Sequence, residues 1–260
     1  MTRIQPADGL LAIDVGNTRI AMAASDADGL HDPRRVSAFE EDDWNAPLRE
    51  LWAGLAGARR RAVVISSVAP RTAELLVGRI EGICEVEPLR VGDDLPLPMA
   101  LDIDNADEVG VDRVCCAAAA FDRLRTACAV ASFGTAITID CVSAAGRFMG
   151  GAILPGLDLC CEALHEGTAQ LPLVEAAVPS AALGRDTRGA ILSGVVYGAV
   201  GALREIVERY ATELGAWPQL VITGGNADLI RAEADFVDCV VPDLCLMGVA
   251  LAHRKAAGQS

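Results

Sequence analysis

The sequence predicts an α/β protein in which helices cover mixed sheets, and the order of its apolar segments is the first reason. Leu10 to Asp14, Arg61 to Ser66 and Trp217 to Thr223 are short apolar runs typical of buried strands. Segments of helical composition lie between such runs, and the longest extends from Gly189 to Leu214. Strands that alternate with helices are the pattern of α/β folds.

Two similar strand–turn–strand units are the second reason, and they indicate two related lobes. The first has the sequence LLAIDVGNTRIAMA, and the second has the sequence AVASFGTAITID. When they are aligned, Gly134 falls on Gly16 and Ser132 on Asp14, about half a chain apart. Self-similarity of this kind is expected of a repeated structural unit.

The composition fits a folded protein of two lobes and limits its partners. A chain of 260 residues has room for two lobes, which we expect over residues 1–125 and 126–260, around a central cleft. The 22 basic and 36 acidic residues give a net charge of −14, so neither nucleic acid nor an anionic membrane surface is expected as a partner. The longest uncharged stretch, Gly189 to Leu203, is shorter than the roughly 18 residues that span a membrane.

The nine cysteines and three histidines predict reduced, mostly buried thiols rather than a metal site. No Cys-x-x-Cys pair occurs, and His31, His165 and His253 are far apart in the chain, so neither zinc nor a redox motif is indicated. The segment from Met1 to Asp8 carries charge and lacks the apolar core of a signal peptide. We therefore expect a cytoplasmic protein whose cysteines pack as small hydrophobic residues.

The motif Asp-Val-Gly-Asn-Thr, directly after the first strand, favours a phosphate-binding turn. A tight turn at Gly16 exposes backbone amides to a phosphate, and the side chains of Asn17 and Thr18 add donors. The carboxylate of Asp14 at the strand end can hold Mg²⁺, which in turn meets the phosphates. A hairpin turn capped by an aspartate is the structural alternative.

Two further glycine-containing turns would complete an ATP site. The turn around Gly134 and Thr135 is the counterpart of the first turn, and two such turns can hold the β- and γ-phosphates from both sides. Gly224 and Gly225 follow another apolar strand and let an adenine or ribose approach the backbone.

The segment Gly110-Val111-Asp112-Arg113 is the candidate catalytic segment. In phosphoryl transfer to an alcohol, an aspartate accepts the hydroxyl proton, and here Asp112 is the candidate general base. Arg113 is a cation for an anionic substrate, and Gly110 leaves room for the substrate to approach. An ion pair on a helix surface remains the alternative for Asp112 and Arg113.

Taken together, the motifs resemble type III pantothenate kinase, a family in the superfamily of acetate and sugar kinases, heat-shock chaperone ATPases and actin. The resemblance runs through nearly the whole chain in eight ordered stretches. They are DVGNT (14–18), EVGVDR (108–113), FGTAITID (133–140), GGAILPG (150–156), GTAQLPL (167–173), LGRDT (183–187), TGG (223–225) and PDL (242–244).

The resemblance implies a homodimer of subunits with two ribonuclease-H-like, actin-like lobes around a nucleotide cleft. It implies that the protein phosphorylates pantothenate with ATP, which is the first step towards coenzyme A. By the same resemblance, residues 14–21 match the nucleotide-phosphate loop, and Thr135 matches an ATP contact. Residues 110–113, with Val111 among them, match the pantothenate-binding segment, where Asp112 has the position of the base, and Thr187 matches a pantothenate contact.

Two departures from the family pattern bear on cation and substrate binding. The family's second turn usually begins with an aspartate that binds a monovalent cation such as K⁺ or NH₄⁺, and here that position is Ser132. A serine hydroxyl is a neutral and weaker ligand, so this position does not imply a cation requirement. The family often has Tyr-x-Asn-Pro before the catalytic segment, where this chain has Ile103 to Ala106.

These departures leave two alternative functions open. The first is a catalytically weak or inactive relative that acts as a binding or regulatory protein, because the family also resembles accessory factors of bacterial gene regulation. The second is a kinase for another small hydroxylated acid, because Ile103 changes the acceptor pocket.

Overall fold

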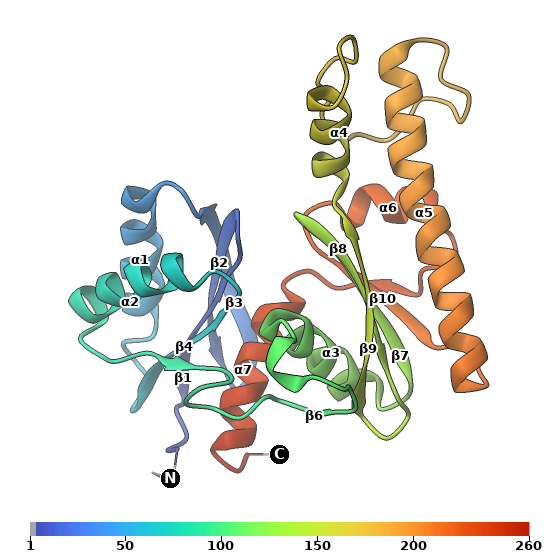
Figure 1. Cartoon of the computed structure of the whole chain (residues 1–260). Helices are drawn as coiled ribbons and strands as arrows, with labels where there is room; N and C mark the ends of the chain where they lie inside the picture. Colours follow the sequence, from blue (N-terminus) through green and yellow to red (C-terminus); the bar gives the residue numbers. More distant parts are fainter. Residues whose placement is uncertain (1–3, 260) are drawn as a thin grey trace. The chain divides into compact units, whose positions relative to one another are not determined.

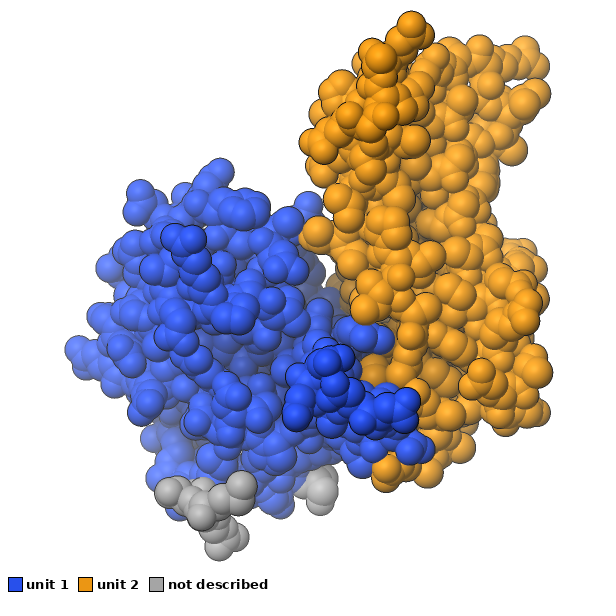
Figure 2. All heavy atoms as spheres, viewed as in Figure 1, with its two compact units in different colours: residues 1–122, 243–260 blue, residues 123–242 orange. Residues whose placement is uncertain are grey.

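The computed structural model describes residues 4–259. Of the segment from Met1 to Asp8, in which no signal peptide is expected, the first three residues lie outside the described residues. The chain forms two compact units, which Figure 2 shows in different colours. Unit 1 comprises residues up to 122 together with those from 243, and unit 2 comprises residues 123–242.

Unit 1 is built on a mixed sheet with strand order β3-β2-β1-β4-β5 (Figure 1). Strand β1 pairs with β2 in the antiparallel sense and with β4 in the parallel sense. The strands are β1 (Gly9–Val15), β2 (Arg19–Asp26), β3 (Gly29–Ser37), β4 (Arg61–Ser67) and β5 (Leu89–Arg90), with a further short strand β6 (Ala100–Leu101). The helices are α1 (Asn45–Gly54), α2 (Pro70–Cys84), α3 (Val111–Leu124) and α7 (Leu244–Ala256), with 3-10 turns at Glu41–Trp44 and Ala106–Glu108.

Strand β1 buries both of its faces, because successive side chains of a strand point to opposite sides of the sheet. Leu11, Ile13 and Val15 pack in the core that includes α1 and α2. Leu10 and Ala12 pack in a second core with residues of α3 and α7. Asp14 is the next alternate residue after Leu10 and Ala12. Its side chain therefore points to the same face of the sheet, which α3 and α7 cover.

Unit 2 repeats this topology, with strand order β11-β10-β7-β8-β9. Strand β7 pairs with β8 in the antiparallel sense and with β10 in the parallel sense. The strands are β7 (Cys128–Phe133), β8 (Ala136–Val142), β9 (Arg147–Pro155), β10 (Gln219–Thr223) and β11 (Cys239–Val240), and the helices are α4 (Leu157–Glu166), α5 (Thr187–Leu214) and α6 (Ala227–Glu233). The predicted α/β architecture with two mixed sheets is confirmed.

The strand registers support the predicted repeat at the level of single residues. Asp14 lies opposite Ala21 of β2 and Ser66 of β4. Ser132 lies at the corresponding place in unit 2, opposite Thr138 of β8 and Thr223 of β10. Ser132 is therefore the positional equivalent of Asp14 in the second sheet.

The expected lobes were residues 1–125 and 126–260, whereas helix α7, which lies near the C-terminus, belongs to unit 1. It packs against β1, β2 and β4 of unit 1. Leu246 and Val249 of this helix fill the core beneath Leu10 and Ala12. Burial of these apolar side chains on the sheet explains why the last residues of the chain return to the first unit.

Helix α5 is, by length and composition alone, the one helix among residues 4–259 that is apolar enough to cross a membrane. A single helix of this kind is weak support for a membrane span, because core helices pass the same test. Val196, Leu203 and Val207 are buried in the core of unit 2, but only 22% of the most apolar window of α5 is buried. Much of its apolar surface is thus left uncovered within one chain.

We expect His253 of α7 to make the stability of the protein sensitive to acid. Burial lowers the pKa of its imidazole, and its Nε2 has no hydrogen-bond partner among the described residues. As the pH falls below the ordinary histidine pKa, the unfolded chain takes up a proton that the folded chain resists, so the free energy of unfolding decreases. Urea unfolding at pH 7.5 and pH 5 should show a smaller loss for His253→Leu than for the unmodified protein. The exposed His31 is the control, and an equal effect of His31→Leu would contradict this assignment.

Candidate active site

The turn between β1 and β2 is tight, and its tip is exposed. The strand pairing ends at Val15 and Ile20, and the backbone N–H of Gly16 donates to the Arg19 carbonyl at 3.0 Å. The two following residues, Asn17 and Thr18, are exposed at the tip of the turn. Their donors are therefore accessible to an anion.

Asp14 lies at the base of this turn, and one of its oxygens is left without a partner. The residue is half-buried on the face covered by α3 and α7, and its buried Oδ1 accepts no hydrogen bond from the described residues. Burial raises the pKa of the Asp14 carboxyl well above its usual range, and the thiol of Cys245 and the carboxyl of Asp112 raise it further. An unsatisfied carboxylate oxygen of this kind fits a hard cation such as Mg²⁺, which binds through oxygen ligands.

Asp112 stands at the start of α3, close enough to Asp14 for the two charges to interact. The carbonyl of Gly110 accepts the N–H of Arg113 at 3.1 Å and begins the helix. A Cβ built on Gly110 would lie 2.6 Å from Oδ1 of Asp112, so glycine at this position lets the carboxylate pack close to the backbone. The helix N-terminus favours the anionic form of an aspartate in its first turn.

In unit 2, the turn at Gly134 and the Gly224–Gly225 pair lie against each other. Gly134 donates its N–H to the Ala136 carbonyl at 3.1 Å, which closes a tighter turn than the one in unit 1, and Thr135 is exposed at its tip. Gly224 has a φ of +100°, and a Cβ there would lie 2.5 Å from the Phe133 carbonyl oxygen. A side chain at Gly224 is therefore excluded both by the backbone conformation and by Phe133.

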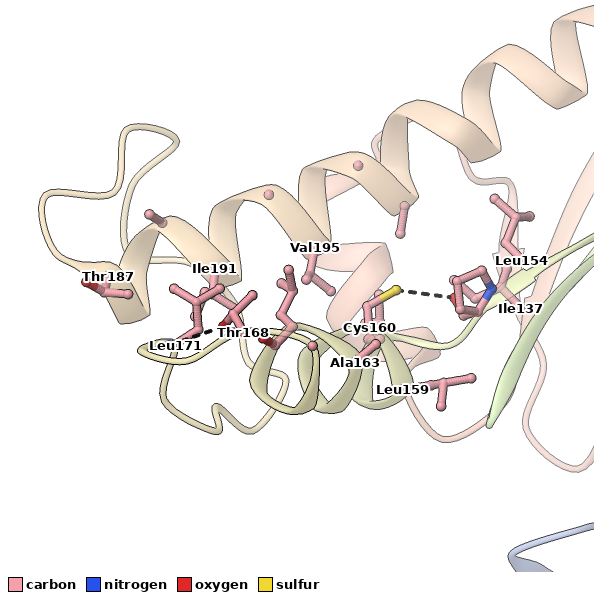
Figure 3. A pocket seen from close by; sticks show the side chains of 18 residues that line it. Ile137, Leu154, Leu159, Cys160, Ala163, Thr168, Leu171, Thr187, Ile191 and Val195 are labelled. Carbon is pink, nitrogen blue, oxygen red and sulfur yellow. Dashed lines mark hydrogen bonds between the residues drawn. The ribbon is translucent and has the colours of Figure 1, made fainter.

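Thr187 is separate from these turns. It is exposed, it is the first residue of α5, and it lies at one end of an apolar pocket of about 960 Å³. Ile137, which follows the second turn, lines the opposite end of the same pocket (Figure 3). Within unit 2, the structure thus does not bring Thr187 next to Thr135.

Sequence reasoning missed three features near the candidate site residues. Ser66 lies beside Asp14 on β4, and its buried Oγ has no hydrogen-bond partner among the described residues. Cys245 of α7 lies near enough to Asp14 to raise the pKa of its carboxyl. Asn226, next to the glycine pair, bonds Asp158 of α4 at 3.2 Å. Only Ser66 had a usable signal, because it ends an apolar strand as Asp14 does.

No group of three or more His, Cys, Asp or Glu side chains within residues 4–259 is placed to hold a metal ion. Mg²⁺ rarely uses such a group, since it usually binds one or two carboxylates together with phosphate oxygens and water.

Known structures define the class of fold to which both units belong. A Campylobacter jejuni protein assigned to the Baf family of transcriptional activators superimposes with a TM-score of 0.61 at 18% identity, over 96% of this chain and 100% of that one. The activator of the 2-hydroxyisocaproyl-CoA dehydratase from Clostridium difficile, with bound ADPNP, superimposes with a TM-score of 0.53 at 12% identity, over 96% of both chains. At these identities the likeness shows the fold alone, which is that of actin-like ATPases and sugar kinases.

Sequence comparison identifies the family. A family model described as type III pantothenate kinase matches residues 10–209. The type III pantothenate kinase of Geobacter sulfurreducens is 38% identical over 251 residues, which cover 95% of this chain and 98% of that protein. The chain belongs to the type III pantothenate kinase family, as the ordered motifs predicted.

Proposed function

We propose that this protein transfers the γ-phosphoryl group of ATP to the primary hydroxyl of pantothenate, and that it does so in the cytoplasm. The observation that carries the proposal is an exposed turn after β1 with Asp14 at its base, whose pKa the charge of Asp112 helps to raise, in a chain of this family. Two nearby carboxylates in different settings can serve different roles, one for a metal and one for a proton.

In this proposal, Asp14 holds Mg²⁺ with its unpartnered oxygen, and Asn17 and Thr18 bind phosphate oxygens. Gly16 belongs to the nucleotide site as the residue that closes the turn, through its N–H to the Arg19 carbonyl. Mg²⁺ supplies positive charge to the transferring phosphoryl group. Asp112 accepts the proton of the pantothenate hydroxyl, and Arg113 attracts the pantothenate carboxylate. Thr135, Gly224 and Gly225 of unit 2 are proposed nucleotide contacts, and Gly110, Val111 and Thr187 are proposed pantothenate contacts.

Incubation of the purified protein with ATP, Mg²⁺ and pantothenate tests the proposal. We expect 4′-phosphopantothenate and ADP in equal amounts, and little ADP when pantothenate is omitted. Other small hydroxylated acids should be offered in parallel, because a better acceptor among them would reassign the substrate. If no phosphorylated product forms and calorimetry detects neither ATP nor pantothenate binding, the protein is a non-catalytic member of the family.

We also propose that Ser132 sets the response to monovalent cations. It occupies the place of Asp14 in the repeated sheet, but a neutral hydroxyl binds K⁺ more weakly than a carboxylate does. We expect the unmodified protein to show little activation by K⁺ or NH₄⁺, and Ser132→Asp to show several-fold activation. Rates with Na⁺, K⁺ and NH₄⁺ chlorides at constant ionic strength measure this. If Ser132→Asp remains indifferent to all three salts, more than one carboxylate is missing from the site.

The apolar face of α4 and α5 supports a homodimer. Leu159 and Leu164 are large apolar side chains that are exposed and line the pocket shown in Figure 3, and α5 has little of its apolar window buried. A second copy of the chain would cover this face and remove the apolar surface from water.

The oligomeric state of the purified protein tests this proposal. Leu159→Asp should give monomers in analytical ultracentrifugation, because a carboxylate would then be buried in the interface. Leu75→Asp is the matched control, since Leu75 is 44% exposed and Leu159 is 42% exposed, but Leu75 lies on α2 of unit 1. A monomeric unmodified protein would refute the homodimer.

A further inference from the structure

Two buried oxygen atoms on neighbouring strands of unit 1 have no hydrogen-bond partner among residues 4–259, and the proposed reaction uses only one of them. They are Oδ1 of Asp14 and Oγ of Ser66. Asp14 is the proposed metal ligand, whereas Ser66, which is fully buried, has no role in the reaction as described so far. Buried polar atoms are almost always hydrogen-bonded, so two unpartnered oxygens at one place indicate a polar ligand there.

The register of the sheet brings these two side chains together. Strands β1 and β4 are parallel, and Asp14 lies opposite Ser66. Neighbouring strands are about 4.8 Å apart, and residues that are opposite each other point to the same face of a sheet. Two positions earlier, Ala12 and Val64 are likewise opposite each other and belong to one core. Ser66 therefore shares with Asp14 the face that α3 and α7 cover.

The backbone holds this pair in place without any ligand. Beyond it, the N–H of Val68 donates to the Val15 carbonyl at 3.1 Å, so the two strands remain joined past both residues. Burial is the main influence on the pKa of the Asp14 carboxyl and raises it, whereas the Ser66 hydroxyl lowers it, which agrees with their closeness. A side chain fixed in this way can orient a ligand accurately.

The repeat in unit 2 carries a hydroxyl at the corresponding place. Thr223 of β10 lies opposite Ser132, just as Ser66 of β4 lies opposite Asp14. Thr223 is only 5% exposed, so a threonine fits this position of the strand. The hydroxyl is thus common to the two units, whereas the carboxylate beside it occurs in unit 1 alone.

We propose that Ser66 is a further residue of the Mg²⁺ site, where its Oγ accepts a hydrogen bond from a water ligand of the ion that Asp14 holds. This role rests on the proposed function, in which Asp14 binds Mg²⁺. The ion keeps several of its waters when it binds to a protein, and a buried water needs hydrogen-bond partners in the protein. Ser66 is therefore a positioning residue, because it acts on the ion and touches no reacting atom.

A pair of substitutions with the same shape isolates the contribution of the hydroxyl. Threonine and valine differ by one hydroxyl in place of a methyl group, so Ser66→Thr keeps the acceptor and Ser66→Val removes it. Mg²⁺ is titrated into the protein with a non-hydrolysable ATP analogue, and the unfolding midpoint is measured, which requires neither acceptor nor turnover. We expect Ser66→Val to need about 10–100-fold more Mg²⁺ for the same rise, as is usual when a partner of a metal ligand is lost. Ser66→Thr should respond like the unmodified protein.

Substitutions that add no volume provide a matched control. Ser66→Ala should show the same loss as Ser66→Val. Ser25→Ala should respond to Mg²⁺ like the unmodified protein, because Ser25 is also buried and lies on the same face, but opposite Leu10 at the other end of β1. These two variants decide the question if the larger side chains at Ser66 both disturb the fold.

A double substitution tests whether Ser66 and Asp14 act on one ion. In the Asp14→Asn protein, we expect Ser66→Val to cause little further loss of the Mg²⁺ response, because residues that share one ligand are not additive. Two independent losses would place Ser66 outside the metal site.

Each contrary result has a separate meaning. Equal Mg²⁺ responses of Ser66→Val and Ser66→Thr overturn the proposed role. So does a lower midpoint of Ser66→Val than of Ser66→Thr without ligands, since Oγ would then be paired within the protein. A protein that responds to Mg²⁺ as expected but forms no 4′-phosphopantothenate refutes the proposed function and leaves the role of Ser66 standing. An unmodified protein whose midpoint does not depend on Mg²⁺ overturns the role of Ser66, whether or not it is a kinase.

Discussion

Replacing Asp112 with asparagine is expected to lower kcat by about 10²–10⁴, which is the usual contribution of a general base. Asparagine keeps the size of the side chain and can still meet a hydroxyl, but it cannot accept the proton. Oδ1 of Asp112 packs close to the backbone of Gly110, where a Cβ would lie 2.6 Å from it, so the carboxylate is held at the start of α3. Steady-state rates with varied pantothenate and saturating ATP measure the effect.

The distribution of the loss between kcat and KM distinguishes a base from a structural residue. A base acts in the transition state, so kcat should fall with little change in KM, and circular dichroism should be unaltered. Asp42→Asn, which changes an exposed aspartate of unit 1, is the control and should keep the full rate. An unchanged kcat for Asp112→Asn would leave Asp112 with only a role at the helix terminus.

The parts of the fold that could be predicted are those where a local pattern and a local cause coincide. Strands β1 and β2 flank a glycine-containing turn and are mostly buried, so their runs of apolar residues predict them from the sequence. Strand β3 could not be found in this way, because none of its residues is buried and it contains Pro33. Its place at the edge of the sheet explains both features, since an edge strand needs neither burial nor every backbone donor.

In the candidate site, too, the residues with a local sequence pattern could be predicted, and their tertiary arrangement could not. Asp14 and Asp112 stand in motifs beside glycines, and their chemistry could be inferred from residue type and position. Their proximity depends on α3 lying over the face that Asp14 shares with Leu10 and Ala12, which is a tertiary arrangement. Cys245 could not be predicted, because only the packing of α7 brings it near Asp14, and the sequence analysis did not identify this helix.

Replacing Asp14 with asparagine is expected to separate activity from stability. If Asp14 holds the metal, the substitution removes charge stabilisation worth several kcal/mol, and the rate should fall about 10²–10³-fold at saturating ATP. The folded state should not suffer, because Oδ1 is buried without a partner and a buried, unpaired carboxylate costs more than an amide. Thermal unfolding without ligands should therefore show an equal or higher midpoint for Asp14→Asn.

Magnesium provides the discriminating measurement for Asp14. A ligand that binds only the folded state raises the unfolding midpoint, so Mg²⁺ with a non-hydrolysable ATP analogue should stabilise the unmodified protein and have a much smaller effect on Asp14→Asn. Asp28→Asn, at an exposed turn of the same unit, should respond like the unmodified protein. Equal stabilisation of all three proteins would mean that the metal is held elsewhere and that Asp14 is buried for a structural reason. A lower midpoint for Asp14→Asn without ligands would mean that the carboxylate is paired in the folded protein, and the cost of its burial could then not be attributed to metal binding.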